Sequence, residues 1–139
     1  MSDRPHRFPV TVYYEDTDMG GIVYHANYLR YVERARSDWV RRIGIDQVGM
    51  RETGQAFAVR RIVSDFLGTA RLDDRLVVET VPSRTSGARM TLAQKITRGE
   101  RTIFRAEVEL VLIDMANGTP RRLPLTLREA VERDLPPAA

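Results

Sequence analysis

The sequence predicts an α+β fold in which one long helix is followed by four strands. Residues 8–15, FPVTVYYE, are rich in β-branched and aromatic types, as strands are. Residues 27–42 carry apolar side chains at the three- and four-residue spacing of an amphipathic helix, and strand-like runs fill the stretch from Gly54 to residue 114. An α+β order of this kind needs its sheet to cover the apolar stripe of the helix. We therefore expect a five-stranded antiparallel sheet wrapped around one long helix.

The first strand runs into a break, TDMGG, whose paired glycines predict a sharp turn before the helix. The helical stripe consists of Tyr28, Tyr31, Val32, Ala35 and Trp39. Gly44 follows where a helix end favours a left-handed residue, and residues 46–53 predict a further short turn of helix.

Four runs, residues 56–66, 75–83, 88–97 and 102–114, predict consecutive strands of a meander. Their connections are short and contain turn residues such as Gly68, Ser86-Gly87 and Gly99-Glu100, so neighbouring strands are expected to be antiparallel. Asn117-Gly118 closes the last strand. A short helix is predicted from Pro124 to Arg133, and the terminal PPAA is expected to fray.

The composition excludes several classes of protein. A length of 139 residues with 42% hydrophobic residues predicts one domain, residues 1–139 with a core at about 8–124. The absence of cysteine excludes disulfides, thiolate nucleophiles and cysteine-ligated metals. Neither a signal peptide nor about 18 consecutive apolar residues occur, so the expected compartment is the cytoplasm.

The charge pattern argues against nucleic-acid binding. The 22 basic and 19 acidic residues, net charge +3, alternate along most segments and form no basic run with interleaved aromatics. A modest basic surplus still suits a ligand that carries phosphates.

Residue types suited to catalysis concentrate in one segment, YYEDTDMGGIVYHANY, at residues 13–28. Glu15, Asp16 and Asp18 crowd the end of the first strand. Crowded, partly buried carboxylates disfavour their own charge, which gives at least one of them a raised proton affinity suited to general-base work. The alternative is structural, because acids at such a junction often bond turn amides or cap the helix.

Two features favour chemistry at this junction. Gly20 and Gly21 allow a ligand to approach the backbone closely, and the first N–H groups of the following helix have no partner within the helix. These donors would polarise a thioester carbonyl, and Asp18, the acid nearest the glycines, would attack it or activate a water. His25 would act as acid or base or orient the loop, and Tyr14 would reach the acids.

Other catalytic centres have weaker support. Asp16, Asp18 and His25 do not present a ligand set with metal-binding spacing, and His6 lies in an N-terminal tail that we expect to be mobile. A serine triad is not predicted, because no G-x-S-x-G elbow occurs.

The segment VYYEDTDMGGIVYHANYLRYVERAR resembles the hotdog-fold acyl-CoA thioesterases of the 4-hydroxybenzoyl-CoA thioesterase family, within it the bacterial branch encoded with the Tol-Pal envelope system. FAVRRIVSDFLGTARLDD and AEVELVLID extend the resemblance over about Pro9 to Pro124. It implies hydrolysis of acyl-CoA to acid and CoA, no metal or organic cofactor, and a homodimer, or a tetramer of two dimers, with active sites between subunits. An acyl carrier protein is a further candidate partner.

The resemblance also implies roles for individual residues. Asp18 matches the family's catalytic carboxylate, as nucleophile or base; His25 and Tyr14 are also implicated, and the carbonyl-polarising amide falls on the N–H of His25. The candidates for substrate binding, which do not all follow from the resemblance, are Gly20, Gly21, Asn27, Arg60, Arg61 and Arg89. At Ser86 the sequence departs from its relatives, which tend to carry an arginine there. The residue that contacts the CoA phosphates therefore cannot be assigned by position. Arg71 and Arg84 are further candidates for that contact.

Two other functions remain open at this level. A non-catalytic acyl-carrier or phospholipid-synthesis partner would keep the hotdog groove only for binding. A hotdog hydratase would need an acid and a base flanking the substrate's α and β carbons.

Overall fold

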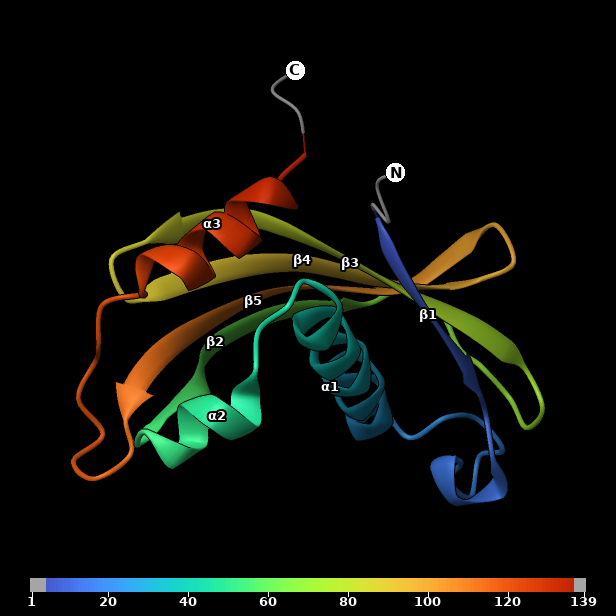
Figure 1. Ribbon diagram of the computed structural model, residues 1–139. Coiled ribbons are helices and arrows are strands. Elements are labelled where there is room, and N and C mark those ends of the chain that lie inside the picture. Colours follow the sequence, from blue (N-terminus) through green and yellow to red (C-terminus); the bar gives the residue numbers. More distant parts are fainter. Residues whose placement is uncertain (1–4, 137–139) are drawn as a thin grey trace.

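A computed structural model describes residues 5–136, and its five strands form one antiparallel sheet in the order β1-β3-β4-β5-β2 (Figure 1). The five-stranded antiparallel sheet is therefore confirmed. Of the PPAA end that the sequence predicts to fray, residues 137–139 lie outside the described part. The strands are β1 (His6–Thr11), β2 (Gln55–Phe66), β3 (Arg75–Ser86), β4 (Arg89–Arg98) and β5 (Arg101–Asp114).

The longest helix, α1 (His25–Arg42, 18 residues), lies in the concave side of the sheet, which arches over it in Figure 1. It packs against β1, β3 and β4, and its predicted apolar stripe is buried there. Gly44, with φ +90°, follows its end. Two short helices accompany it, α2 (Gln47–Glu52), capped by the Asp46 carboxylate, and α3 (Leu125–Arg133), so the expectation of a single long helix holds in part.

The meander prediction is right for β3, β4 and β5 and wrong for β2. Strand β2 does not pair with β3 but with β5 at the far edge, for example Phe66 opposite Phe104. The segment after β2 therefore crosses the end of the sheet, where the N–H groups of Leu67 and Gly68 both donate to the Ile103 carbonyl. A Cβ on Gly68 would lie 3.0 Å from the Ile103 side chain, so this crossing is tightly packed.

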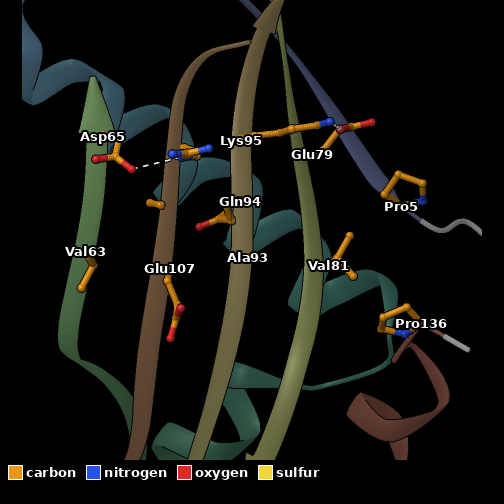
Figure 2. Close-up of a pocket in the computed structure, with 12 residues that line it drawn as sticks. Pro5, Val63, Asp65, Glu79, Val81, Ala93, Gln94, Lys95, Glu107 and Pro136 are labelled. Atoms are coloured by element: carbon orange, nitrogen blue, oxygen red, sulfur yellow. Dashed lines mark hydrogen bonds and ion pairs between the residues drawn. The ribbon is translucent and has the colours of Figure 1, made fainter. Parts of the chain in front are cut away.

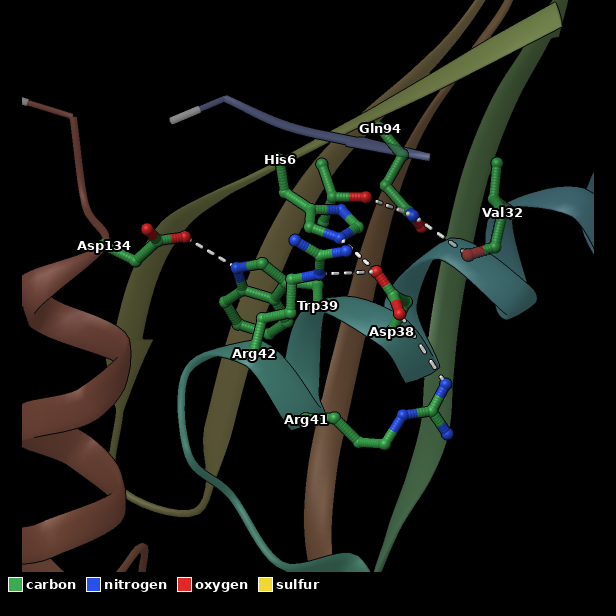
Figure 3. Close-up of polar contacts among 9 residues, drawn as sticks. His6, Val32, Asp38, Trp39, Arg41, Arg42, Gln94 and Asp134 are labelled. Atoms are coloured by element: carbon green, nitrogen blue, oxygen red, sulfur yellow. Dashed lines mark hydrogen bonds and ion pairs between the residues drawn. The ribbon is translucent and has the colours of Figure 1, made fainter. Parts of the chain in front are cut away.

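The expected mobile tail around His6 is also corrected. His6 begins β1, pairs with Thr80 of β3 and is 4% exposed. Its Nε2–H donates to Asp38 of α1 at 2.7 Å, and Arg42 Nε donates to the same carboxylate at 3.0 Å (Figure 3). Strand β1 is thereby tied to the helix, and it ends at Thr11, four residues before the predicted end.

A buried polar contact positions α1 over the middle of the sheet. Gln94 of β4 donates to the Val32 carbonyl at 3.0 Å and to Thr80 Oγ1 at 2.9 Å, and it accepts from Arg36 Nη1 at 3.0 Å. Because buried polar groups are costly without partners, this network fixes one register of helix on strand. Figure 3 shows the contact of Gln94 with Val32 between α1 and the strands.

Helix α3 lies beside the second half of β3, where β1 no longer pairs. The indole N–H of Trp39 in α1 donates to Asp134 at the end of α3, at 2.6 Å (Figure 3). Thr85 of β3 donates to Glu132 at 3.3 Å. The C-terminal helix is therefore docked against both the sheet and α1.

Candidate active site

The loop between β1 and α1 folds back on itself and delivers the chain to the helix. The Asp18 N–H donates to the Ile22 carbonyl, and the Gly21 N–H donates to the Asp18 carbonyl, both at 3.0 Å. Gly21 has φ +77°, a left-handed conformation that favours glycine. Asp18 therefore sits at the tip of a tight reversal that ends where α1 begins.

The two aspartates of this loop have different surroundings. Asp16 is 5% exposed and accepts from the Tyr13 N–H and from Asn27 Nδ2, both at 2.9 Å. Its backbone carbonyl accepts from the Tyr24 N–H at 2.9 Å. Burial and the nearby Asp16 carboxylate raise the pKa of Tyr31 far above its usual value. Asp16 thus fastens the loop to α1.

Asp18 is exposed, and its side chain is held by one contact, in which the Gly20 N–H donates to Oδ1 at 2.8 Å. A Cβ at Gly20 would lie 3.2 Å from that same oxygen, so glycine keeps room for the carboxylate. The other oxygen makes no hydrogen bond within residues 5–136. This geometry leaves Asp18 open to a ligand.

The N-terminus of α1 lies directly after this loop. Tyr24 precedes the helix without a side-chain cap, and its carbonyl accepts from the Asn27 N–H at 2.8 Å. The N–H of His25, the first helical residue, has no acceptor in the described part of the chain. A helix N-terminus carries partial positive charge, so this free donor can bind a carbonyl or oxyanion.

The segment between β2 and β3 packs against the loop between β1 and α1. The Val23 N–H donates to the Ala70 carbonyl at 2.8 Å, and Ile22 forms a bridge with Arg71. The Tyr28 hydroxyl donates to the Gly68 carbonyl at 3.0 Å. Backbone contacts therefore hold the loop, and a side-chain hydrogen bond holds the start of α1, against the segment that crosses the end of the sheet.

Comparison with known proteins agrees with this arrangement. Residues 12–132 match the model of the thioesterase-like superfamily. The acyl-CoA thioesterase YbgC of Haemophilus influenzae is 39% identical over 131 residues, which cover 94% of this chain and 96% of the relative. The chain belongs to the thioesterase-like superfamily.

Solved structures agree with this membership. The "Probable Thioesterase" of Bartonella henselae is 40% identical with a TM-score of 0.76, and the match covers 86% of this chain and 97% of that one. Slr0204 of Synechocystis, a 1,4-dihydroxy-2-naphthoyl-CoA thioesterase, shares the fold with a TM-score of 0.83 at 24% identity, over 90% of this chain and 93% of that one. The protein is a hotdog-fold thioesterase, and hence an enzyme.

The remaining predicted residues of the thioesterase site are placed as follows. Tyr14 opens a one-turn 3₁₀ helix (Tyr14–Asp16), and the residue is 82% exposed. Asn27 is buried and engaged with Asp16, so it holds the loop in place. The His25 ring lies against Tyr24 and, edge-on, against Phe66, with centroids 4.5 and 6.0 Å apart.

The three predicted phosphate-binding arginines of the thioesterase do not lie at this loop within one chain. Arg60 of β2 and Arg89 of β4 both form ion pairs with Glu109 of β5, at 3.0 and 3.3 Å. Arg61, the next residue of β2 after Arg60, is exposed. Arg89 and Arg98 are the two ends of β4, about 30 Å apart at the usual rise of a strand. Two other arginines reach the loop region. Arg71, the further candidate named above, forms a backbone bridge with Ile22 of the loop, and Arg98 donates to the Thr69 carbonyl.

Sequence reasoning missed two residues near the candidate site, Phe66 and Arg98. Both adjoin the loop only because β2 and β4 end there, and local sequence carries no signal of that placement. Within residues 5–136, no three histidine, aspartate or glutamate side chains are grouped closely enough to hold a metal ion. No described helix is long and apolar enough to cross a membrane.

A hollow of about 930 Å³ lies on the sheet face turned away from α1 (Figure 2). Its floor includes Val63, Val81 and Ala93, and Lys95 pairs with Glu79 along one side, at 3.0 Å. Figure 2 looks onto this face with the helices behind the strands. The hollow contains none of the residues predicted for catalysis.

Proposed function

We propose that the protein hydrolyses acyl-CoA thioesters to free acid and CoA, with Asp18 as the catalytic carboxylate. One observation carries this proposal: an exposed carboxylate at the tip of a tight turn directly precedes a helix whose first N–H has no partner in the described chain. The relatives named acyl-CoA thioesterase or acyl-CoA thioester hydrolase, from Haemophilus influenzae and Escherichia coli, support the substrate class.

The proposed electrophilic group is the backbone N–H of His25. A thioester carbonyl bound there is polarised by the hydrogen bond and by the helix N-terminus, and the bond strengthens as negative charge develops on the oxygen. The His25 ring and Tyr14 would border the bound substrate, and Asn27 would act by keeping Asp16 and the loop in position.

Two modes of action suit this arrangement. As nucleophile, an Asp18 oxygen bonds to the acyl carbon, the C–S bond breaks, CoA thiolate leaves and takes up a proton, and water then hydrolyses the mixed anhydride. As general base, Asp18 removes a proton from the water that attacks the same carbon. Either mode yields one acid and one thiol per water consumed.

We further propose a homodimer, or a tetramer of two dimers, with active sites between subunits. Strand β2 is an edge of the sheet, and its half-exposed apolar side chains Val59, Val63 and Phe66 favour pairing with a second copy. The hollow on the outer face offers a second contact surface. The CoA phosphates would then meet arginines, among Arg60, Arg61 and Arg89, from the other subunit.

The cellular setting is proposed from the sequence. The resemblance to the branch encoded with the Tol-Pal system supports a cytoplasmic enzyme that serves the cell envelope. An acyl carrier protein is a candidate alternative acyl donor, and competition with acyl-CoA in the same assay would reveal it.

The decisive test measures release of free thiol from a panel of acyl-CoA substrates by the wild type and by Asp18→Asn. Loss of a general base typically lowers the rate by about 10² to 10⁴, and loss of a nucleophile lowers it further. We expect Asp18→Asn to lose at least about 10² in kcat and to keep its thermal stability, because Asp18 is exposed.

Glu15→Gln provides the matched control, because Glu15 is an exposed carboxylate of the same loop, and it should retain wild-type turnover. Full activity in Asp18→Asn would refute the assignment of this residue. A wild type that binds acyl-CoA saturably but releases no thiol from any substrate would favour the non-catalytic binding partner.

A further inference from the structure

An aromatic cluster runs from the surface at the start of α1 down into the core. Phe66, the last residue of β2, is 48% exposed, although its ring contacts three aromatic side chains. The ring centroids lie 6.0 Å from His25, 5.9 Å from Tyr28 and 5.1 Å from Phe104. Phe66 therefore forms the surface layer of this cluster beside the residue that offers the free N–H.

Two buried aromatic rings lie beneath Phe66. Tyr28 of α1 and Phe104 of β5 stack at 5.4 Å, and both are almost completely buried. The Tyr28 hydroxyl is held by the Gly68 carbonyl, which prevents its ring from swinging aside without losing a hydrogen bond. A group that enters beside His25 thus meets an aromatic floor formed by Phe66, Tyr28 and Phe104.

We propose that Phe66 determines acyl specificity by limiting how deep the acyl group can go. This inference rests on the proposed function, because it takes the thioester carbonyl to be bound at the His25 N–H. An acyl chain that leaves this carbonyl toward the protein reaches the Phe66 ring within a few carbon atoms. The site as it stands therefore favours short or flat acyl groups, which lie on the ring.

Truncation of Phe66 would convert this surface into a pocket. Phe66→Ala removes the ring above Tyr28 and Phe104 and leaves an apolar recess in which a longer chain gains contacts. Each added methylene in a hydrophobic pocket changes kcat/KM by roughly 10- to 200-fold when it fits. Short acyl groups gain nothing, because they do not reach the recess.

The test compares kcat/KM for acetyl-, butyryl-, hexanoyl- and octanoyl-CoA in the wild type, Phe66→Ala and Phe66→Leu. We expect the octanoyl-to-acetyl ratio to rise by at least about tenfold in Phe66→Ala. The more conservative Phe66→Leu should show a smaller rise and provides a second reading if the alanine variant folds poorly. Phe57→Ala, a phenylalanine near the other end of β2, is the matched control and should leave the ratio unchanged.

The outcomes separate this inference from the function on which it rests. A wild type that hydrolyses acyl-CoA with an octanoyl-to-acetyl ratio that neither Phe66 variant changes overturns the role of Phe66 alone. A ratio that rises equally in Phe57→Ala also overturns it, because the effect would then be general loosening. A wild type that releases no thiol from any substrate overturns the proposed function.

Discussion

Asp16 and Asp18 are two residues apart and have different tasks, because the loop buries one and exposes the other. Asp16 accepts three hydrogen bonds, two on its carboxylate and one on its carbonyl, and lies under the loop. Asp18 accepts one side-chain bond and faces outward. Residue type alone does not distinguish them. Their hydrogen-bond partners distinguish them, because a carboxylate whose oxygens already accept bonds from the protein is not free to react with a substrate.

Asp16→Ala should lower the free energy of unfolding by roughly 2 to 4 kcal/mol, because it leaves the Tyr13 N–H and the buried Asn27 amide without acceptors. Urea unfolding measures this loss. Glu15→Ala, at the exposed neighbouring position, should change stability by less than about 0.5 kcal/mol. Equal stabilities of these two variants would contradict the role given to Asp16.

Gly20→Ala tests whether the room around the Asp18 carboxylate matters. The added Cβ would lie 3.2 Å from Asp18 Oδ1, while the backbone of Gly20 does not need a left-handed conformation. We therefore expect thiol release to fall several-fold with little loss of stability. Gly118→Ala, in the turn after β5, should instead lose about 1 kcal/mol of stability with full activity, because that glycine has φ +71°. Unchanged activity in Gly20→Ala would show that the carboxylate adapts.

At the scale of elements, β1 is held by the sheet on one side and by α1 on the other. Burial alone would raise the pKa of Asp38, but the hydrogen bond from His6 and the Arg42 guanidinium outweigh it and hold the pKa below its usual value. A carboxyl group with a depressed pKa in the folded state stabilises the fold above its unfolded pKa of about 4 and loses that contribution as the pH falls further.

Protonation of Asp38 in acid should therefore weaken its contacts with His6 and Arg42 and lower the free energy of unfolding. We expect Asp38→Asn to be less stable than the wild type in urea at pH 7, and the gap to narrow below about pH 4, when the wild-type carboxyl takes up its proton. Asp46→Asn, which keeps a helix cap that asparagine can also supply, serves as the control. A gap that stays constant down to pH 3 would contradict this account.

The sequence predicted the elements well and their partners less well, for a physical reason. The helical period of α1 and the strand runs are signals between neighbouring residues, and these elements lie within a few residues of their predicted bounds. The main differences are the end of β1 and the end of β3, which continues past a register shift near Pro82 to Ser86. The place of β2 beside β5 depends on a loop that crosses the sheet, and the burial of His6 depends on Asp38, 32 residues away. Asp18 was singled out because its turn glycines adjoin it, whereas Phe66 joins the site only through the fold.

At the scale of the whole molecule, the sheet is open at β1 and β2 and hollowed on its outer face. Val63 belongs both to the open edge of the sheet, because it lies on β2, and to the lining of the hollow on the outer face. It is half-exposed and stands opposite Glu107 of β5. A lysine there would face an opposite charge within one chain and resist pairing with a second chain.

Val63→Lys should therefore remain folded and shift the protein toward monomers in sedimentation analysis at micromolar concentration. If the active sites are shared between subunits, thiol release should fall in parallel with the assembly. Val48→Lys, on the exposed side of α2, is the control and should keep both mass and activity. A wild type that sediments as a monomer would contradict the proposed assembly.

The contact between Trp39 and Asp134 gives the protein a built-in optical reporter. Trp39 is the single tryptophan of the chain, it is buried, and its indole N–H points at the carboxylate that ends α3. Intrinsic fluorescence excited at the indole band therefore comes from one place, the junction between the C-terminal helix and α1. Undocking of α3 would expose this indole to water and shift its emission to longer wavelength, so a spectrometer can follow the C-terminal helix without any label.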